Sequence, residues 1–564
     1  MEKEKLAAEQ RASGGRAKKA KNSCQEVRDE EEQVTTAVAS DRAQQLQGMA
    51  EKLSLEIQGM SNYKQLYSEI QRIVASSAVK KDDFKNTLLE ALKREGLETE
   101  LRNTVFHWMR SQRLDKPKEQ ANVYGADLSY LKKAQMQWER RIQKSLNSMC
   151  NELNIPLARL RSAADRDELA EKWNELSTCD FDLGQYRPLF APKDFLEVLF
   201  SLRDPTFKKQ PNELNWEFSH IQIKVKTLAQ LRDAYEELSR GEPLLGVNGN
   251  VASSLGHCPN LEAERIHLGE KVLKANQAPV AQEFLKRGCP RALRGRLWSL
   301  VLGSVVRDAD ADYYDELKAM VLQYDLMVDK LIIKDVQLTA SNDDQYFVFE
   351  DLLYKTMLSF SRDSEVLPSV TRDKCAGGQV IHAVLQGKPA TLENTLVFPP
   401  SGVIPFHGFT MYATPFCYLY DDPCAIYFTF RAFYLRYWFR LHTVSSHEQG
   451  IVAVCLCFER LLQCHEPELW AHFRNLHIPP VKVVFKWLMR GFSGHLPPEQ
   501  LLYLWDLVLA YDSLEIVALL AATILSFRKD NLMQVNTVHN VEAVLADLSS
   551  IKVMPLLQLS LLRD

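Results

Sequence analysis

Hydrophobic residues recur at helical spacing along most of this chain, and strand-like alternation is rare. Apolar side chains that return every three or four residues predict a helix that begins at Asn62 and runs past Ile73. They also predict two short amphipathic helices on either side of Gly96, at 83–92 and 97–108. Further helices are predicted from Leu128 to Leu153 and from Ala164 to Leu176. His220 to Val225 alternates between apolar and polar residues and predicts one strand.

From Leu261 onward one helical pattern follows another, and no alternation of strands with helices indicates a parallel sheet. We therefore expect an all-α fold.

Residues 1–48 form an N-terminal tail that is rich in charged and small residues and has no aromatic residue. This tail cannot bury enough apolar surface to offset the entropy of ordering. The predicted organisation is a disordered tail 1–48, a helical hairpin region 49–115, a helical and irregular region 123–260, a multi-helical domain 280–525 and a C-terminal helical segment 526–564.

The helical pair around Gly96 has two interpretations. Leu and Gly at these spacings are common in helical hairpins that pack within one chain. The stretch from Leu88 to Met109 also resembles the LisH-type helices that pair two copies of a protein. A packed hairpin and a homodimer through the N-terminal helices are therefore both open.

Charge and cysteine content exclude several classes of protein. The net charge of −4 over 564 residues gives no overall basic field for nucleic acid. The 11 cysteines are scattered without a repeating frame, which is typical of a reducing compartment and a cytoplasmic protein. The apolar run Ile516 to Phe527 is shorter than the about 20 residues that span a bilayer, so we expect a buried core helix and no transmembrane segment.

A metal site is not expected. Cys455, Cys457, Cys464 and His465 are the one tight group of potential ligands, but they lie in an apolar helical pattern without the paired spacing of zinc ligands. Free cysteine behaves as a small core hydrophobe. We therefore interpret this group as part of the core.

Three motifs follow one another in the C-terminal half. The first is the Gly-x-Pro turn 288–290 with Leu-Arg-Gly-Arg-Leu-Trp at 293–298, and the second is Ile-x-x-Asp-x-x-Leu-Thr at 332–339. The third runs from Trp487 to the Leu-Trp-Asp element that ends at Asp506. Together they resemble the TBC domain, the all-helical module of Rab GTPase-activating proteins, over about 280–525. Several ordered motifs are more specific than any one of them.

The resemblance implies a regulator of a Rab GTPase. In this family an arginine from the second motif enters the active site of the partner, and arginine fingers in general accelerate GTP hydrolysis by roughly 10³–10⁵. A glutamine from a Tyr-x-Gln-Gly motif positions the attacking water. GTP and Mg²⁺ belong to the partner, so the chain needs no cofactor, and its Rab would bring it to endomembranes.

Both finger positions depart from the family pattern. Leu338 stands where the arginine is expected, and leucine has neither charge nor donor. Aligned on Gly408, the second motif places His407 at the glutamine position. Histidine can hydrogen-bond a water, although a purely structural histidine is an equal alternative. The stretch from Leu338 to His407 is longer than is usual in the family, and it contains the polar segment 361–400.

Four more positions complete the predicted site and its support. Asp335 matches the residue that orients the finger arginine; here it is expected to pair with Lys334, Arg294 or a partner residue, or to be a plain surface carboxylate. Lysine lacks the planar fork of arginine, so Lys334 is a poor substitute finger. Gly408 is kept from the second motif. The structural residues of the first and third motifs are Trp298, Trp487, Trp505 and Asp506.

Two functions remain. The chain is either a GTPase activator for a Rab protein with degenerate fingers, or a Rab-binding scaffold that has kept the fold and lost the chemistry. Neither is an enzyme with a substrate of its own, because the hydrolysed nucleotide is bound by the partner.

Overall fold

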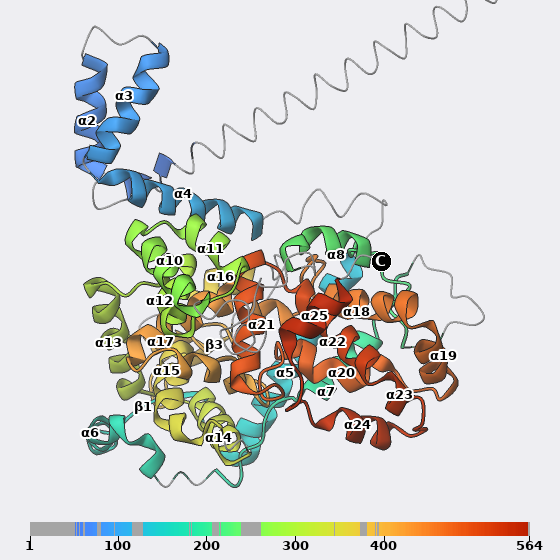
Figure 1. Ribbon diagram of the computed structural model, residues 1–564. Coiled ribbons are helices and arrows are strands. Elements are labelled where there is room, and N and C mark those ends of the chain that lie inside the picture. Colours follow the sequence, from blue (N-terminus) through green and yellow to red (C-terminus); the bar gives the residue numbers. More distant parts are fainter. Residues whose placement is uncertain are drawn as a thin grey trace, which may run out of the picture. The chain divides into compact units, whose positions relative to one another are not determined.

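The computed structural model describes residues 51–561, except 52–53, 56, 60–62, 76–80, 95, 115–127, 180, 182, 206–213, 215, 239–260, 343–344, 373–380, 390 and 392–393. The predicted disordered tail 1–48 lies outside the described residues. The chain divides into two units, residues 1–111 and 112–564, and the described part of each is helical (Figure 1).

The first unit contains the predicted helical pair. Its helices are α2 (Tyr63–Ala75), α3 (Lys81–Arg94) and the start of α4 (Leu97–Leu114). Leu66, Leu92 and Leu97 form its small buried core. Gly96 has a φ of +73°, the left-handed conformation that favours glycine, and it separates α3 from α4 as the sequence predicts.

The second unit opens with elements that precede the predicted multi-helical domain. They are α5 (Ser129–Leu153), β1 (Ala158–Leu160), α6 (Ala163–Glu171), η2 (Lys172–Asn174), η3 (Leu176–Thr178), α7 (Pro192–Phe200), α8 (Leu228–Ala234) and η4 (Glu236–Leu238). The helix predicted at 128–153 is confirmed, whereas the one predicted at 164–176 ends early and continues as two short 3-10 turns. The strand predicted at 220–225 is wrong: Ile221 and Ile223 are buried and alternate with exposed residues, but these residues pair with no described strand.

Helices continue to the end of the described chain. They are α10 (Leu261–Ala275), α11 (Ala278–Lys286), α12 (Arg294–Leu302), α13 (Asp308–Gln323), α14 (Met327–Asn342), α15 (Glu350–Arg362), α16 (Val366–Arg372), α17 (Pro423–Arg436), α18 (Ile451–His465), α19 (Pro467–Asn475), α20 (Pro480–Met489), α21 (Pro498–Tyr511), α22 (Glu515–Phe527), α23 (Lys529–Leu532), α24 (Val538–Ala546) and α25 (Val553–Ser560). Short 3-10 turns join them: η5 (Arg291–Leu293), η6 (Phe347–Phe349), η8 (Phe409–Tyr412), η9 (Thr414–Tyr418) and η10 (Trp438–Leu441). The all-α prediction is confirmed.

The core of the second unit lies around α22, whose residues 515–525 are all buried. It packs against α18, α20 and α25. The apolar run at 516–527 is thus a core helix, as its length predicts. Among the described helices, none is both long enough and apolar enough to cross a membrane.

The sequence pattern did not predict two small antiparallel sheets. β1 pairs with β2 (Tyr324–Leu326), with Arg159 opposite Asp325, and β3 (His382–Val384) pairs with β4 (Thr395–Val397). The first sheet joins the N-terminal part of the second unit to the residues just before α14. The label of β1 lies in the lower part of Figure 1, as do those of α14 and α15. The pairing of β1 with β2 thus positions α14, the helix that carries the second motif.

Candidate functional site

The second motif lies on α14, whose first turn is fixed by a buried ion pair. The carboxylate of Asp329 accepts the backbone N–H of Leu326 at 3.0 Å. Both Nη atoms of Arg362 on α15 donate to the same carboxylate at 2.7 Å. Asp329 and Arg362 are almost fully buried, so this bidentate pair sets the start and direction of α14.

Asp335, further along α14, binds the loop that carries the second finger position. Its carboxylate accepts the backbone N–H of Gly408 at 2.5 Å, the N–H of Thr410 at 2.8 Å and the hydroxyl of Thr410 at 2.7 Å. Asp335 is only 5% exposed. The expectation of a surface carboxylate, or of an ion pair with Lys334 or Arg294, is therefore corrected: Asp335 joins the two finger motifs to each other.

His407 has both of its backbone groups bonded. Its N–H donates to the carbonyl of Phe190 at 3.0 Å, and its carbonyl accepts from Nη2 of Arg490 at 2.9 Å. The imidazole is 43% exposed, and its Nδ1 lies 4.0 Å from a carboxylate oxygen of Asp335, which is beyond hydrogen-bond distance. The loop is thus fixed by its backbone, and the side chain of His407 is left at the surface.

Position 408 requires glycine for two reasons, its backbone conformation and the side chain of Arg490 beside it. Its φ of +89° lies in the left-handed region, and a Cβ built at this position would lie 1.9 Å from Nη2 of Arg490. Burial lowers the pKa of the Arg490 guanidinium, and the carboxylate of Asp335 opposes that effect. The guanidinium occupies the space that any other side chain at 408 would need.

Lys334 immediately precedes Asp335 on α14, and Leu338 lies about one turn after it. Leu338 is half-buried. The Nζ atom of Lys334 donates to the carbonyl of Leu183 at 2.8 Å. The structure therefore ties Lys334 to the region before the predicted domain and gives α14 no guanidinium near position 338.

The first and third motifs meet in the core. Nη2 of Arg294 donates to Asp506 at 2.8 Å, and Nε1 of Trp298 donates to the same carboxylate at 2.7 Å. Burial alone would lower the pKa of Arg294, but the Asp506 carboxylate outweighs it, so the pKa is raised. Trp487 and Trp505 are buried too. Arg294 thus joins α12 to α21 and does not bond Asp335.

Sequence reasoning missed three parts of this site. Thr410 follows Gly408 by two residues, and its hydroxyl and N–H make it a natural partner for a carboxylate, but nothing in the pattern pointed to Asp335. Arg490 lies within the third motif without any spacing signal of its own. No sequence pattern singled out the segment Leu183–Phe190. All three depend on contacts between residues far apart in the sequence.

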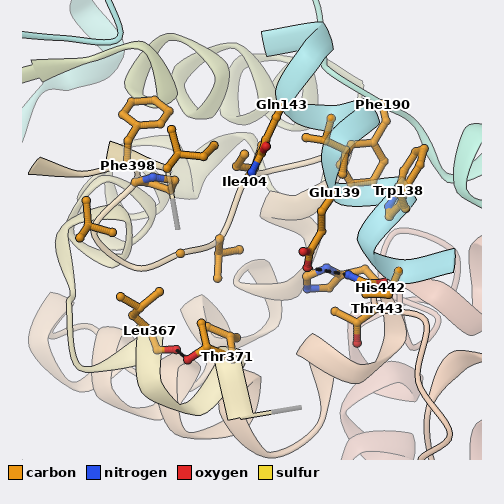
Figure 2. Close-up of a pocket in the computed structure, with 18 of the residues that line it drawn as sticks. Trp138, Glu139, Gln143, Phe190, Leu367, Thr371, Phe398, Ile404, His442 and Thr443 are labelled. Atoms are coloured by element: carbon orange, nitrogen blue, oxygen red, sulfur yellow. Dashed lines mark hydrogen bonds between the residues drawn. The ribbon is translucent and has the colours of Figure 1, made fainter. Parts of the chain in front are cut away.

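A cavity of about 100 Å³ is lined in part by Ile404, which precedes residues 407–410, the finger loop (Figure 2). Trp138 and Glu139 of α5 line one side and Ile404 another, with Phe190 beside Trp138. Its volume is well below the roughly 300–1,000 Å³ of pockets for drug-sized ligands, so it cannot hold a nucleotide.

Metal ligation has no geometric support in the described residues, where no group of three or more His, Cys, Asp or Glu side chains could hold an ion. Cys455 and Cys457 are buried on α18, and burial raises the pKa of both thiols. They pack in the core of the second unit.

Three kinds of comparison show what this chain is similar to. The Rab-GTPase-TBC domain family matches residues 406–533, a range that starts at the finger loop. TBC1 domain family member 19 of Homo sapiens is 43% identical over 511 residues, which cover 90% of this chain and 96% of the relative. TBC domain-containing protein kinase-like protein of Dictyostelium discoideum is 27% identical over 133 residues, which cover 23% of this chain and 13% of that relative. The crystal structure of the Ypt/Rab-GAP domain of Gyp1p covers 54% of this chain and 97% of its own, with a TM-score of 0.37 and 14% identity.

The human relative matters most, because its similarity extends over nearly the full length of both chains. It therefore includes the elements before residue 280 as well as the three motifs. The match to the family begins within the loop that Asp335 binds. The chain belongs to the TBC-domain family of Rab GTPase-activating proteins.

Proposed function

We propose that this chain binds a GTP-loaded Rab GTPase at the surface formed by α14 and residues 407–410, and that it accelerates hydrolysis of the bound GTP. The observation that carries the proposal is the bonding of Asp335 to Gly408 and Thr410. It holds the two finger positions, Leu338 and His407, on adjoining elements. A buried carboxylate with three donors is a strong, specific link.

The reaction itself takes place in the partner. A water oxygen attacks the γ-phosphorus, the bond from that phosphorus to the β–γ bridging oxygen breaks, and the bridging oxygen leaves with the electron pair on GDP. The proton lost by the water ends on inorganic phosphate. GTP and Mg²⁺ are bound by the Rab protein, and this chain contributes side chains only. In its neutral form an imidazole has one donor and one acceptor, which would suit the side chain of His407 to hold the attacking water.

Leu338 limits the rate that this arrangement can give. An arginine finger stabilises the charge on the transferring phosphoryl oxygens and contributes roughly 10³–10⁵ in rate. Leucine supplies none of that charge. We therefore expect an acceleration below the usual range, unless another guanidinium of the chain reaches the nucleotide.

A Rab-binding scaffold is the second candidate, and the apolar side chain of Leu338 is the observation that favours it. A scaffold would keep the hydrogen bond between Asp335 and Gly408 as part of its docking surface. It would bind GTP-loaded Rab without turnover. Either protein would be peripheral on endomembranes through its Rab partner.

Single-turnover GTP hydrolysis across a panel of Rab proteins, with binding measured in parallel, separates the two candidates. Acceleration on at least one Rab by micromolar protein supports the activator. Binding to GTP-loaded Rab with no acceleration on any member supports the scaffold. A chain that binds no GTP-loaded Rab and accelerates hydrolysis on none would contradict both candidates.

A further inference from the structure

The segment Leu183–Phe190 lies against both finger motifs. At one end the carbonyl of Leu183 accepts from Nζ of Lys334 at 2.8 Å and from the N–H of Tyr186 at 3.1 Å. At the other end the carbonyl of Phe190 accepts the N–H of His407 at 3.0 Å. One short stretch from the region before the predicted domain therefore bridges α14 and the finger loop.

Arg187 lies in the middle of this bridge. Consecutive residues span at most about 3.6 Å each, so its Cα lies within about 11 Å of Phe190. Pro188 follows it, and a residue before proline is biased to an extended backbone. The two ends and the proline thus restrict where the backbone of Arg187 can be, while its long side chain remains on the surface.

Arg187 is only loosely held by its neighbours. Its side chain is 52% exposed, and Nη2 lies 3.8 Å from a carboxylate oxygen of Glu152, which is itself 57% exposed. Exposed ion pairs of this kind contribute little and are screened by salt. The guanidinium can therefore leave Glu152 at small cost when a more negative ligand approaches.

Several other cations near the two finger motifs are held more closely. Lys334 donates to the carbonyl of Leu183, and Arg490 donates to the carbonyl of His407. Four more pair with buried aspartates: Arg159, Arg161 and Lys330 with Asp325, and Arg362 with Asp329.

Arg159 is the other half-exposed arginine among them, at 48%, but its Nε lies 2.7 Å from the buried carboxylate of Asp325. Removing it would leave Asp325 with less compensation for its burial. Removing Arg187 would leave no buried carboxylate without a partner, because the side chain of Glu152 is exposed.

We propose that Arg187 supplies the guanidinium that position 338 lacks: it reaches from the Leu183–Phe190 bridge to the phosphoryl oxygens of the GTP in the bound Rab. This inference rests on the proposed activator function. The planar guanidinium presents paired donors to phosphate oxygens, which a lysine cannot reproduce. It would stabilise the charge on the γ-phosphoryl group while the water adds and GDP leaves, without taking a proton itself.

The test is single-turnover hydrolysis with the full chain and the GTP-loaded Rab that the wild type accelerates most. Arg187→Ala is expected to lower the saturating rate by about tenfold or more, a fraction of what arginine fingers contribute. Binding of Rab loaded with a non-hydrolysable GTP analogue should change little. Arg187→Lys should stay close to Arg187→Ala, because it keeps the charge and loses the fork.

Two further variants make the result specific. Arg166→Ala removes another half-exposed arginine of the same region, on α6 (54% exposed), and should behave as the wild type. Adding Leu338→Arg to Arg187→Ala should restore much of the lost rate, because it returns a guanidinium to the family position.

Each outcome has a clear meaning. A wild type that accelerates hydrolysis and an Arg187→Ala variant with the same rate would overturn this inference and leave the proposed function intact. Equal losses of rate and binding would make Arg187 a docking residue and also overturn it. A wild type without activity on any Rab would refute the proposed function, and this inference with it.

Discussion

The carboxylate of Asp335 accepts the backbone N–H of Gly408 at 2.5 Å, across a separation of 73 residues. This contact turns two separate motifs into one site. It also gives Asp335 a structural reason to be kept where the finger arginine is absent, because a buried carboxylate stripped of its donors is costly. The hydrogen bonds that hold the two finger positions together therefore do not depend on a finger arginine in this chain.

Gly408→Ala should disrupt the hydrogen bonds that hold the two finger positions together. The substitution forces a side chain into left-handed backbone and places Cβ against the guanidinium of Arg490. We expect a loss of about 2 kcal/mol or more in the free energy of unfolding, measured by urea denaturation. Gly387→Ala is the matched control, because Gly387 has a similar φ of +74° and no atom within 4 Å of the added Cβ.

The difference between these two variants isolates the clash from the backbone strain. Arg490→Ala combined with Gly408→Ala should recover part of that difference, since the two side chains compete for one space. Equal losses for Gly408→Ala and Gly387→Ala would show that Arg490 moves aside freely.

Leu338→Arg should raise the rate of GTP hydrolysis more than it changes Rab binding. The new guanidinium stands at the family's finger position, one turn from Asp335, and stabilises charge that develops only during the reaction. Single-turnover rates and binding to analogue-loaded Rab give the two quantities. Leu338→Ala should leave any existing activity unchanged; if it abolished that activity, the leucine would be part of the machinery.

Stability should fall as the pH is lowered from about 6.5. Burial, with Arg440 nearby, lowers the pKa of His447 to about 3; burial, with Arg490 and Lys486, does the same to His495. Between pH 6.5 and 3 the unfolded chain holds protons on these imidazoles that the folded chain does not. The free energy of unfolding therefore decreases by up to about 1.4 kcal/mol per pH unit for each histidine.

Urea denaturation at pH 7, 6 and 5 measures this slope. His495→Gln should reduce it by the share of one histidine. His267→Gln, at an exposed position of α10, should retain the wild-type slope. A wild-type free energy that stays constant from pH 7 to pH 5 would contradict the prediction.

We also propose that the N-terminal helices pair two copies of the chain. Tyr67 and Val74 lie seven residues apart on α2 and are 50% and 65% exposed, and Leu89 on α3 is 38% exposed. A core as small as that of the first unit gains from association. Light scattering of the full chain should give a dimer, which Tyr67→Lys with Val74→Lys converts to a monomer.

Val305→Lys is the control for this pair, because Val305 is a 54% exposed apolar residue of the second unit. It should leave the dimer intact. A wild-type chain that is monomeric at high concentration would dispose of the proposal.

Local patterns were a good guide to the helices and a poor one to the site's contacts. The spacing of apolar residues predicted α5 closely and predicted the buried helix α22, because a helix face is encoded by residues three and four apart. The same reasoning failed at 220–225, where burial alternates as in a strand but no partner strand lies alongside. Pairing depends on a second segment, which one stretch of sequence does not specify.

By itself the sequence determined the helical class, the family resemblance and the identity of the residues at the two finger positions, Leu338 and His407. These follow from local spacing and side-chain chemistry. The folded structure was needed to show that Asp335 binds Gly408, that the guanidinium of Arg490 fills the space beside that glycine, and that Leu183–Phe190 contacts both motifs. Those contacts join residues up to about two hundred positions apart, and their geometry is set by how the helices pack, not by any pattern within one of them.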